Sequence, residues 1–590
     1  MKQRTSFSLA SWLRLVALSL LLGLALLAGN VLSIETAHAQ SFNAAITCPK
    51  ITGFTPTSGS IGSSVTITGC GFTGATKVTF KGVSATFAVN SDTQITATVP
   101  NGATTGIIAV TTANGTIVKS ASKFIVLAPP PAVTLSPTAG PPTSTVSVSG
   151  SNFGSYEAVD IYFDTTDEAL AAANVQGAFS GINIPVPASA VPGTHWVTAV
   201  GRHSGLSAQA AFTVQTNWAE FGDVAQHTGV NPYENVLNPS NVTDLDLDWS
   251  APTGAGIDSS SAVANGVVYV GSEDHNLYAF NVQTGAEVWS APTGAGIDSS
   301  SAVANGVVYV GSEDHNLYAF NAQTGAEVWS APTSFYIDSS PAVANGVVYV
   351  GSTDSNLYAF NAQTGAQLWK APTGSYISTS SPAVANGVVY VGSTDSNLYA
   401  FNAQTGAQLW KAPTGSYIDS SPAVAHGVVY VGSEDHNLYA FNAKTGVQLW
   451  KAPTGSYIDS SPAVANGVVY VGSDDDNLYA FNAQTGAQLW KAPTGNTILS
   501  SPAVANGVVY VGSDDGSLYA FNAQTGAQLW SAVTGGSIHS SPAVANGVVY
   551  VGSDDGSLYA YSLPPNDQLK PPTRPNVGSL HPNLKLHLQS

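Results

Sequence analysis

The chain has 590 residues, which is too long for one hydrophobic core and indicates several domains. Only 9% of the residues are charged, and Gly, Ser, Thr, Ala and Val are abundant, which favours short strands and tight turns over helical bundles. The formal net charge is −19, and residues 251–561 hold five lysines and no arginine against 22 acidic residues, so a nucleic-acid partner is not expected.

The N-terminus has the pattern of an export signal. Basic residues Lys2, Arg4 and Arg14 precede an apolar run, and Ala37-His38-Ala39 forms a small-x-small cleavage site. We therefore predict a signal peptide over residues 1–39 and a secreted or cell-surface protein, periplasmic if the cell has an outer membrane. The run is also long enough for an uncleaved anchor. After cleavage no stable membrane insertion is expected.

The chain has two cysteines, Cys48 and Cys70. An even count in an exported chain favours a disulfide over two unrelated thiols. If Ile51–Phe54 and Val65–Thr68 pair as an antiparallel hairpin around the turn at 57–62, the two cysteines face each other across it. The sequence therefore predicts a Cys48–Cys70 disulfide.

Residues 48–126 alternate apolar and polar side chains, as in Val65-Thr66-Ile67-Thr68, which predicts half-buried strands of a sandwich. The stretches Ile51–Gly59 and Val65–Phe72 resemble the IPT/TIG immunoglobulin-like family. Residues 132–214 are similar to a second, more divergent copy, marked by Val146–Gly154. A proline-rich linker at Ala128–Pro131 separates the two.

Internal repetition dominates the rest of the chain. The segment that begins Ala251-Pro252-Thr253 recurs from residues 291, 331, 371, 412, 452, 492 and 532, at spacings of 40 or 41 residues. In one unit, Asp419–Ala425, Val428–Gly432, Leu438–Asn442 and Gln448–Trp450 are expected to be strands. His426-Gly427, or Asn-Gly in the other copies, makes a hairpin turn between the first two.

Four strands at a period near 40 residues predict propeller blades. The fourth strand carries a tryptophan that is expected to pack neighbouring blades together. It occurs eight times, as Trp249, Trp289, Trp329, Trp369, Trp410, Trp450, Trp490 and Trp530. Trp249 precedes the first repeat and the last repeat lacks a fourth strand, so Leu245–Trp249 is expected to complete the last of eight blades and close the ring. Residues 562–590 are expected to be a flexible tail.

The stretch Ala279–Gly285 with Trp289 resembles the docking motif of quinoprotein propellers, with Asn281 in place of the usual Asp. The segment from Phe221 to Gly229 also resembles the start of such domains. The resemblance to the pyrroloquinoline-quinone (PQQ) repeat family covers residues 217–561. It implies the propeller fold for this region, which completes an all-β architecture of two immunoglobulin-like sandwiches followed by an eight-bladed propeller. It does not imply the cofactor, because the motif also serves binding scaffolds such as the propeller lipoprotein of outer-membrane assembly.

The repeats show no pattern typical of a catalytic or cofactor-binding site. The family's enzymes need calcium ligands, a catalytic aspartate and cofactor-covering insertions, whereas these blades are uniform and offer no break in symmetry for one small-molecule site. No arginine or lysine is expected near the axis to meet the quinone's carboxylates, since the five lysines of the repeats lie on or beside the outer strands: Lys370, Lys411, Lys444, Lys451 and Lys491. No catalytic, cofactor-binding or metal residue is therefore predicted, and neither PQQ nor calcium is expected.

One face of the ring is the best candidate binding surface, because the loops that precede the first and the third strand of each blade emerge on the same side. It gathers tyrosine, acidic and histidine side chains, which we name the candidate face: Tyr336, Tyr376, Tyr417, Tyr457, Glu273, Asp274, His275, Glu313, Asp314, His315, Glu434, Asp435 and His436. Tyrosine often anchors protein or glycan contacts, and acidic groups with histidine could hold cations weakly. Alternatively, the aspartates serve their own turns and the histidines are only exposed.

These observations favour a non-catalytic extracellular protein that binds a protein or cell-surface glycan through a propeller face. The alternative is a PQQ-dependent dehydrogenase.

Overall fold

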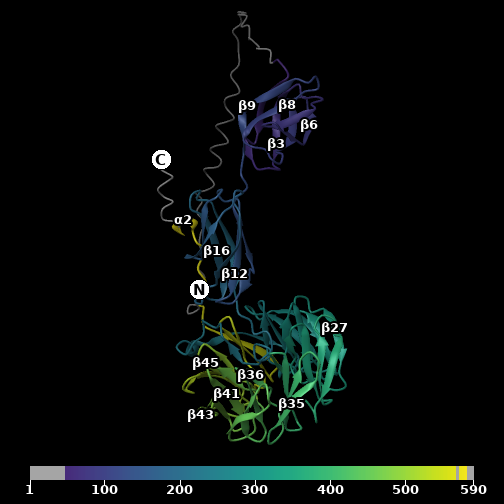
Figure 1. Ribbon diagram of the computed structural model, residues 1–590, viewed down its shortest axis with the longest axis vertical. Coiled ribbons are helices and arrows are strands. Elements are labelled where there is room, and N and C mark those ends of the chain that lie inside the picture. The colour runs from purple at the N-terminus through teal and green to yellow at the C-terminus, as the bar shows by residue number, and fades with distance from the viewer. Residues whose placement is uncertain (1–46, 566–569, 581–590) are drawn as a thin grey trace, which may run out of the picture. The chain divides into compact units, whose positions relative to one another are not determined.

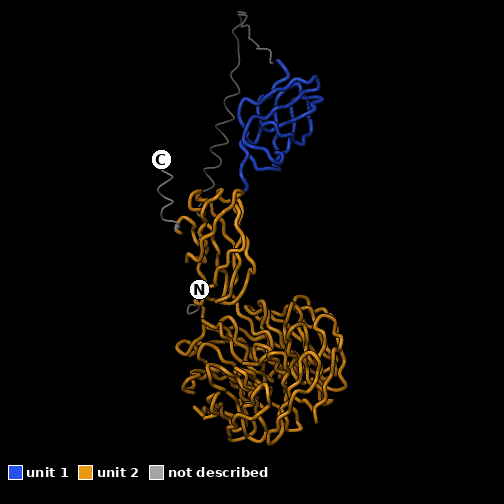
Figure 2. The backbone as a smooth tube through the Cα atoms, viewed as in Figure 1, with its two compact units in different colours: residues 1–129 blue, residues 130–590 orange. Residues whose placement is uncertain are grey.

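The computed structural model describes residues 47–565 and 570–580 (Figure 1). The predicted signal peptide at 1–39 lies outside the described residues. The chain divides into two compact units, residues 1–129 and 130–590 (Figure 2). Apart from η1 (Val242–Asp244) and α2 (Val577–Leu580), the elements are strands, so the all-β prediction is confirmed. Within the described ranges, no helix has the length and apolar character needed to cross a membrane.

The first unit is a two-sheet sandwich with strand orders β1-β3-β7-β6 and β2-β9-β8-β4-β5. In β3, Val65 and Ile67 are fully buried while Thr68 is exposed, which is the predicted alternation. Phe54 and Phe124 meet between the sheets with ring centroids 6.0 Å apart. The strands are β1 (Lys50–Thr55), β2 (Ser58–Gly59), β3 (Ser64–Cys70), β4 (Lys77–Phe80), β5 (Val83–Ala85), β6 (Phe87–Ser91), β7 (Gln94–Thr98), β8 (Gly106–Thr111) and β9 (Ile117–Val126).

The predicted disulfide joins Cys48 and Cys70, whose Cα atoms lie 5.6 Å apart. The expected pairing of β1 with β3 is present, but its register differs: Phe54 pairs with Ile67, and beyond a bulge between Ile51 and Gly53 it is Lys50 that lies opposite Cys70. Cys48 therefore reaches its partner from just outside the ladder. The expected turn at 57–62 also contains β2, which leaves this sheet and pairs with β9 of the other one.

Residues 132–214 form a second sandwich, with strand orders β10-β12-β15 and β11-β17-β16-β13-β14. Val146 and Val148 of β12 and Val197 and Ala199 of β16 are fully buried in its core. The strands are β10 (Ala132–Ser136), β11 (Ala139–Gly140), β12 (Thr145–Ser151), β13 (Ala158–Phe163), β14 (Thr166–Ala172), β15 (Phe179–Pro185), β16 (Gly193–Gly201) and β17 (Ser207–Val214).

The segment 570–580 differs from the predicted flexible tail, because it packs against the second sandwich. The Arg574 guanidinium lies 4.6 Å from the centre of the Trp196 ring, and its Nε donates to Gln209 Oε1 at 2.7 Å. The Gln209 amide donates in turn to the Pro575 carbonyl at 3.0 Å. A stacked guanidinium and a proline-stiffened backbone explain why this segment has a defined position.

Residues beyond 230 form eight sheets of four or five strands, each corresponding to one repeat. The blade at 423–453 contains β36 (Ala423–Ala425), β37 (Val428–Ser433), β38 (Asn437–Asn442) and β39 (Gln448–Pro453). His426 and Gly427 both have positive φ, as the predicted hairpin turn requires. The innermost strand is shorter than expected, because Asp419–Ser421 turn toward the propeller axis and Pro422 has no N–H to pair.

The other blades repeat this arrangement. Their strands are β20 (Ala262–Ala264), β21 (Val267–Gly271), β22 (Asn276–Asn281) and β23 (Glu287–Pro292); β24 (Ala302–Ala304), β25 (Val307–Gly311), β26 (Asn316–Asn321) and β27 (Glu327–Pro332); β28 (Ala342–Ala344), β29 (Val347–Ser352), β30 (Asn356–Asn361) and β31 (Gln367–Pro372); β32 (Ala383–Ala385), β33 (Val388–Ser393), β34 (Asn397–Asn402) and β35 (Gln408–Pro413); β40 (Ala463–Ala465), β41 (Val468–Ser473), β42 (Asn477–Asn482) and β43 (Gln488–Pro493); β44 (Ala503–Ala505), β45 (Val508–Gly512), β46 (Ser517–Asn522) and β47 (Gln528–Val533) with β18 (Val230–Asn231); and β48 (Ala543–Ala545), β49 (Val548–Ser553), β50 (Ser557–Ser562) and β19 (Asp246–Pro252).

The last blade is completed as predicted, because β19 comes from before the first repeat and pairs antiparallel with β50. Two indoles tie this strand to its neighbours. Trp249 Nε1 donates to the Val282 carbonyl of the first blade at 3.1 Å, and Trp530 Nε1 of the seventh blade donates to the Leu245 carbonyl at 3.0 Å. The ring therefore closes through the segment 245–252.

The eight tryptophans occupy equivalent positions between blades. Each indole N–H donates to a backbone carbonyl of the following blade at 3.0–3.2 Å. A Cβ on Gly285 would lie only 2.7 Å from the Trp249 ring, so the glycine of the Thr-Gly turn allows the indole to dock. Asn281 Oδ1 accepts the Thr284 N–H at 3.1 Å, which shows how asparagine can hold this turn.

Candidate binding site at the propeller axis

The inner ends of the blades enclose a cavity of about 320 Å³ at the propeller axis. Each blade contributes the residue at one repeat position shortly before its innermost strand. These residues, the axial ring, are Asp258, Asp298, Asp338, Thr379, Asp419, Asp459, Leu499 and His539. The closed ring thus brings five carboxylates and one imidazole from different repeats to the opening of this cavity, which we call the axial mouth.

A second ring, made of serines, lines the same cavity two residues further along each blade. The backbone N–H of each serine donates to the hydroxyl oxygen of the serine in the next blade, at 2.8–3.0 Å. The last of these bonds runs from Ser541 back to Ser260, so the chain of hydrogen bonds is closed. The members are Ser260, Ser300, Ser340, Ser381, Ser421, Ser461, Ser501 and Ser541. This ring fixes the loops that carry the acidic groups above it.

The segment 218–231, which we call the axial plug, contacts the innermost strand of every blade. It starts with a two-way backbone pairing between Trp218 and Val263 and ends with the Asn231 amide, which donates to the Val544 carbonyl of the last blade at 2.9 Å. Between them, its oxygens accept the N–H of one valine in each remaining blade: Val303, Val343, Val384, Val424, Val464 and Val504. Phe221 lines the axial cavity, so it forms part of the floor.

The plug buries three titratable side chains, Glu220, Asp223 and His227, without counter-ions among the residues that the structure describes. Burial raises the pKa of Glu220 to about 8, even though its carboxylate accepts the Val343 N–H. Burial, with Glu220 nearby, raises the pKa of Asp223 well above its usual value. Burial lowers the pKa of His227 to about 4. All three groups therefore favour their neutral forms near pH 7, as expected for buried charges without counter-ions.

The axial carboxylates are also forced toward protonation. Burial, together with neighbouring acidic groups, raises the pKa of Asp298 to about 7. For Asp338, Asp419 and Asp459, burial followed by repulsion from nearby carboxylates raises the pKa to about 6. One carboxylate oxygen in each of these last three residues is buried and has no hydrogen-bond partner. The mouth therefore favours a ligand that brings positive charge and hydrogen-bond donors.

An outer acidic ring surrounds this mouth. It comes from the loops that follow the second strand of six blades, and its members are Glu273, Glu313, Glu434, Asp474, Asp514 and Asp554. Burial and adjacent carboxylates raise the pKa of Asp474 to about 6. The outer ring thus extends the negative potential from the cavity toward solvent.

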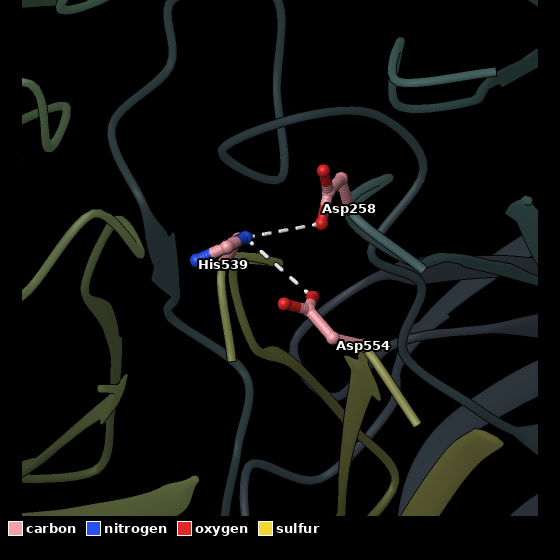
Figure 3. Close-up of side chains that lie close together, drawn as sticks. All are labelled: Asp258, His539 and Asp554. Atoms are coloured by element: carbon pink, nitrogen blue, oxygen red, sulfur yellow. Dashed lines mark hydrogen bonds and ion pairs between the residues drawn. The ribbon is translucent and has the colours of Figure 1, made fainter. Parts of the chain in front are cut away.

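His539 is a built-in counter-cation at this mouth (Figure 3). Its Nδ1 lies 3.2 Å from Asp258 Oδ1 and 3.5 Å from Asp554 Oδ1, and its Nε2 lies 3.2 Å from Asp514 Oδ1. The hydrogen bond to Asp258 and the surrounding carboxylates raise the pKa of His539 to about 9, and the same hydrogen bond lowers the pKa of Asp258.

The same side chains are a candidate metal site. One ligand atom from each of Asp258, His539 and Asp554 lies within 4.8 Å of the others, and Asp258 also groups in this way with Glu273 and Asp298. A metal would have to displace the proton that these carboxylates hold on the imidazole. The geometry therefore supports an internal ion-pair cluster first and a metal site second.

Comparison with known families agrees with this architecture. The outer membrane protein assembly factor BamB family matches residues 237–378, and the β-propeller of the beta-alanine-activating enzyme matches residues 336–574. The IPT/TIG domain family matches residues 49–126. The chain is a PQQ-like repeat propeller protein with an IPT/TIG domain. Among curated proteins, none matches the sequence.

Solved structures show the same propeller fold. A europium-containing methanol dehydrogenase is 15% identical, with a TM-score of 0.52, and the alignment covers 59% of this chain and 98% of that one. A quinohemoprotein alcohol dehydrogenase from Pseudomonas putida is 17% identical, with a TM-score of 0.52 and coverage of 61% and 82%. BamB from Moraxella catarrhalis is 21% identical, with a TM-score of 0.48 and coverage of 54% and 99%. At these identities the likeness to the two dehydrogenases concerns the fold alone.

The tyrosines and histidines of the candidate face are partly brought together by the PQQ-like propeller. Tyr336, Tyr376, Tyr417 and Tyr457 are 41–58% exposed. His315 lies beside Tyr336, with ring centroids 5.2 Å apart, and His436 lies 5.1 Å from Tyr457. Glu273, Glu313 and Glu434 belong to the outer acidic ring, and His275 shares the turn that follows Glu273.

The three aspartates of the candidate face instead serve their own blades. Asp274 Oδ1 accepts the Asn276 N–H, and its Oδ2 accepts the Tyr278 hydroxyl at 2.7 Å and the Gly254 N–H at 2.6 Å. Asp314 and Asp435 make the same bond to the equivalent tyrosine hydroxyl. These aspartates hold the turn, which is the alternative that the sequence had left open.

Two expectations about the axis need correction. The blades do break symmetry there, because the axial ring reads Asp in five blades and Thr379, Leu499 and His539 in the other three. The axis also has a cation, His539, which sequence reasoning missed. Aligning the eight repeats would have revealed both features, since the serine two positions later is constant while the axial position varies.

Proposed function

We propose that this exported protein is a non-catalytic binding protein whose propeller receives a cationic group of a protein partner in its axial mouth. The observation that carries this proposal is the convergence of five axial carboxylates on one cavity, of which three have a buried oxygen without a hydrogen-bond donor. A lysine or arginine side chain would supply both the charge and the donors.

The surroundings of the mouth support a protein partner. Exposed tyrosines on the same loops as the axial ring offer rigid, amphipathic contact area, as is common at protein interfaces. The outer acidic ring would attract a basic segment from a distance and orient it. The matched BamB family is named for outer membrane protein assembly, which agrees with a scaffold role. A glycan that stacks on the same tyrosines is the second candidate.

A charged probe tests the mouth directly. We expect a fluorescently labelled tetralysine peptide to bind the mature chain at low ionic strength, and the double variant Asp419→Asn/Asp459→Asn to bind it about tenfold more weakly, because two axial charges are lost. Fluorescence anisotropy measures both affinities. The matched control is Glu287→Gln/Glu327→Gln, which removes two exposed charges from the outer strands β23 and β27. Equal weakening in both variants would mean that only net charge matters, and would overturn the proposal.

The alternative, a PQQ-dependent dehydrogenase, requires that the axial cavity fit a flat tricarboxylate. The lining residues do not fit it. They include five carboxylates, one histidine already held by three carboxylates, and a single aromatic side chain, Phe221, on which a ring could stack. Repulsion of the quinone's carboxylates is the expected result. The four lysines of the outer strands, such as Lys370, lie 5.6–5.9 Å from tyrosine ring centres on their own blades and do not line the cavity.

We therefore expect no heat of binding when the purified protein is titrated with PQQ in the presence of calcium, and no alcohol- or sugar-dependent dye reduction. Isothermal titration calorimetry and a dye-linked assay measure these two properties. Micromolar binding of one PQQ per chain would restore the dehydrogenase alternative.

A further inference from the structure

The first sandwich carries a charge opposite to that of the propeller. Residues 47–129 contain five lysines, no arginine, no glutamate and a single aspartate, Asp92. Asp92 lies in the turn between β6 and β7, where its carboxylate accepts the N–H groups of Gly71 and Thr73, which lowers its pKa. The sheet β2-β9-β8-β4-β5 contains no acidic residue. In a chain with a net charge of −19, this sheet is therefore a local exception.

Three lysines lie on the outer face of that sheet. Lys119 and Lys123 of β9 and Lys77 of β4 are exposed, while their neighbours Ser120, Phe124 and Val78 are buried toward the core. Exposed isoleucines Ile117 and Ile125 lie on the same face of β9, at 61% and 50% exposure. We call this surface the lysine face. No ion pair among the described residues involves its lysines.

A β-bulge brings two of these lysines together. Lys119 pairs with Ala109 and Lys123 with Ile107, so four residues of β9 span only two residues of β8. The Cα atoms of the two lysines are therefore separated by roughly 7 Å along the sheet instead of roughly 13 Å. The Ser120 hydroxyl stabilises this bulge, since it accepts the Ile108 N–H at 2.9 Å and donates to the Ser122 carbonyl at 2.7 Å.

From this charge and spacing we infer that the lysine face binds a linear polymer of phosphate groups, a role separate from the proposed function of the axial mouth. Lysine ammonium groups bind phosphate as compact point charges without a fixed fork geometry, which suits a repeating polyanion. The face has no exposed tryptophan or tyrosine of the kind that anchors proteins at a lipid interface. Charge complementarity thus favours the polymer over a membrane surface.

Long-chain inorganic polyphosphate is the probe for this site. We expect the mature chain to bind it at 50 mM salt, and the double variant Lys119→Gln/Lys123→Gln to bind at least tenfold more weakly. The slope of log K against log salt concentration should become shallower by about 1.4, at about 0.7 for each lost contact to a flexible strand. The matched control Lys370→Gln/Lys411→Gln removes two lysines from the propeller's outer strands β31 and β35 and should change the affinity less than twofold.

Each other outcome contradicts the inference. Absence of polyphosphate binding, or equal weakening by both double variants, would show that the lysine face has no such role. Binding to phosphatidylglycerol vesicles but not to polyphosphate would assign the face to a membrane instead. The axial variant Asp419→Asn/Asp459→Asn should leave polyphosphate binding intact, so failure here and failure of the proposed function can be told apart. Unchanged melting of the lysine variants shows that the sandwich remains folded.

Discussion

Replacement of Leu245–Trp249 by a glycine–serine segment of equal length should lower the melting temperature of the propeller and promote aggregation. This segment starts the strand that completes the last blade, and through Trp249 and the Leu245 carbonyl it also contacts the blades on either side. Loss of the Trp249 indole alone is expected to cost about 3–5 kcal/mol of unfolding free energy. The replacement also exposes the edge of β50, which could pair with another chain. Differential scanning calorimetry and light scattering measure the two effects.

A matched tryptophan separates ring closure from simple loss of packing. Trp369 is as buried as Trp249, at 9% exposure, and makes the same indole hydrogen bond to the following blade. Trp369→Ala should therefore destabilise the protein about as much as Trp249→Ala, but only the segment replacement should cause aggregation. If the segment replacement melts at the wild-type temperature, the ring does not depend on β19.

The blades could be predicted because their signals are local and repeated. Hairpin turns such as His426-Gly427 recur in every unit, and the Thr-Gly-x-x-x-Trp spacing recurs in the first seven. The eighth tryptophan, Trp249, required a strand from before the first repeat. Each expectation depended on residues less than one repeat apart. The closure through β19 followed from the same count, because the last repeat has no fourth strand of its own.

The axial site could not be predicted to the same degree because it exists only in the closed ring. Asp258 and His539 lie 281 residues apart, and only the meeting of the first and last blades places them in contact. The axial plug has no periodicity, since each of its residues meets a different blade. The bulge between Ile51 and Gly53 and the docking of Arg574 on Trp196 and Gln209 are tertiary features that leave no pattern in the sequence.

The stability of the propeller should decrease as the pH rises from about 5 to about 8. Asp338, Asp419 and Asp459 have pKa values near 6, and Asp298 near 7, against 3.8 for an unperturbed aspartate. Between these values the folded state binds protons that the unfolded state has lost, so stability is fully present below about pH 4 and is lost as the pH rises through 6 to 7. His539 acts in the same direction at higher pH, because its pKa rises from 6.5 to about 9 on folding.

Other groups have the opposite effect and lower the stability of the propeller at acid pH. Hydrogen bonds from Tyr278 and its neighbours outweigh burial and lower the pKa of Asp274, so the contribution of this aspartate to stability is lost in acid. His227, with a pKa of about 4, favours folding more strongly as the pH rises from 4 to 6.5. The melting temperature should therefore pass through a maximum near pH 5 and fall by about 5 °C or more by pH 8. Calorimetric scans across this range in matched ionic strength measure the profile.

Variants of the axial mouth identify which groups cause the fall in melting temperature between pH 5 and 8. Asp419→Asn/Asp459→Asn should raise the melting temperature at pH 8 and leave it nearly unchanged at pH 5, because the native carboxyls are already mostly protonated there. His539→Gln should have the opposite effect at pH 8, since Asp258, Asp514 and Asp554 would lose their shared counter-cation. Glu287→Gln/Glu327→Gln serves as the matched control on the outer strands. The contrary outcome is a melting temperature that does not change between pH 5 and 8, or a control variant that is stabilised as much as the axial variant. Either result would show that repulsion among the axial carboxylates does not weaken the fold. The main argument for cation binding at the mouth would then fail.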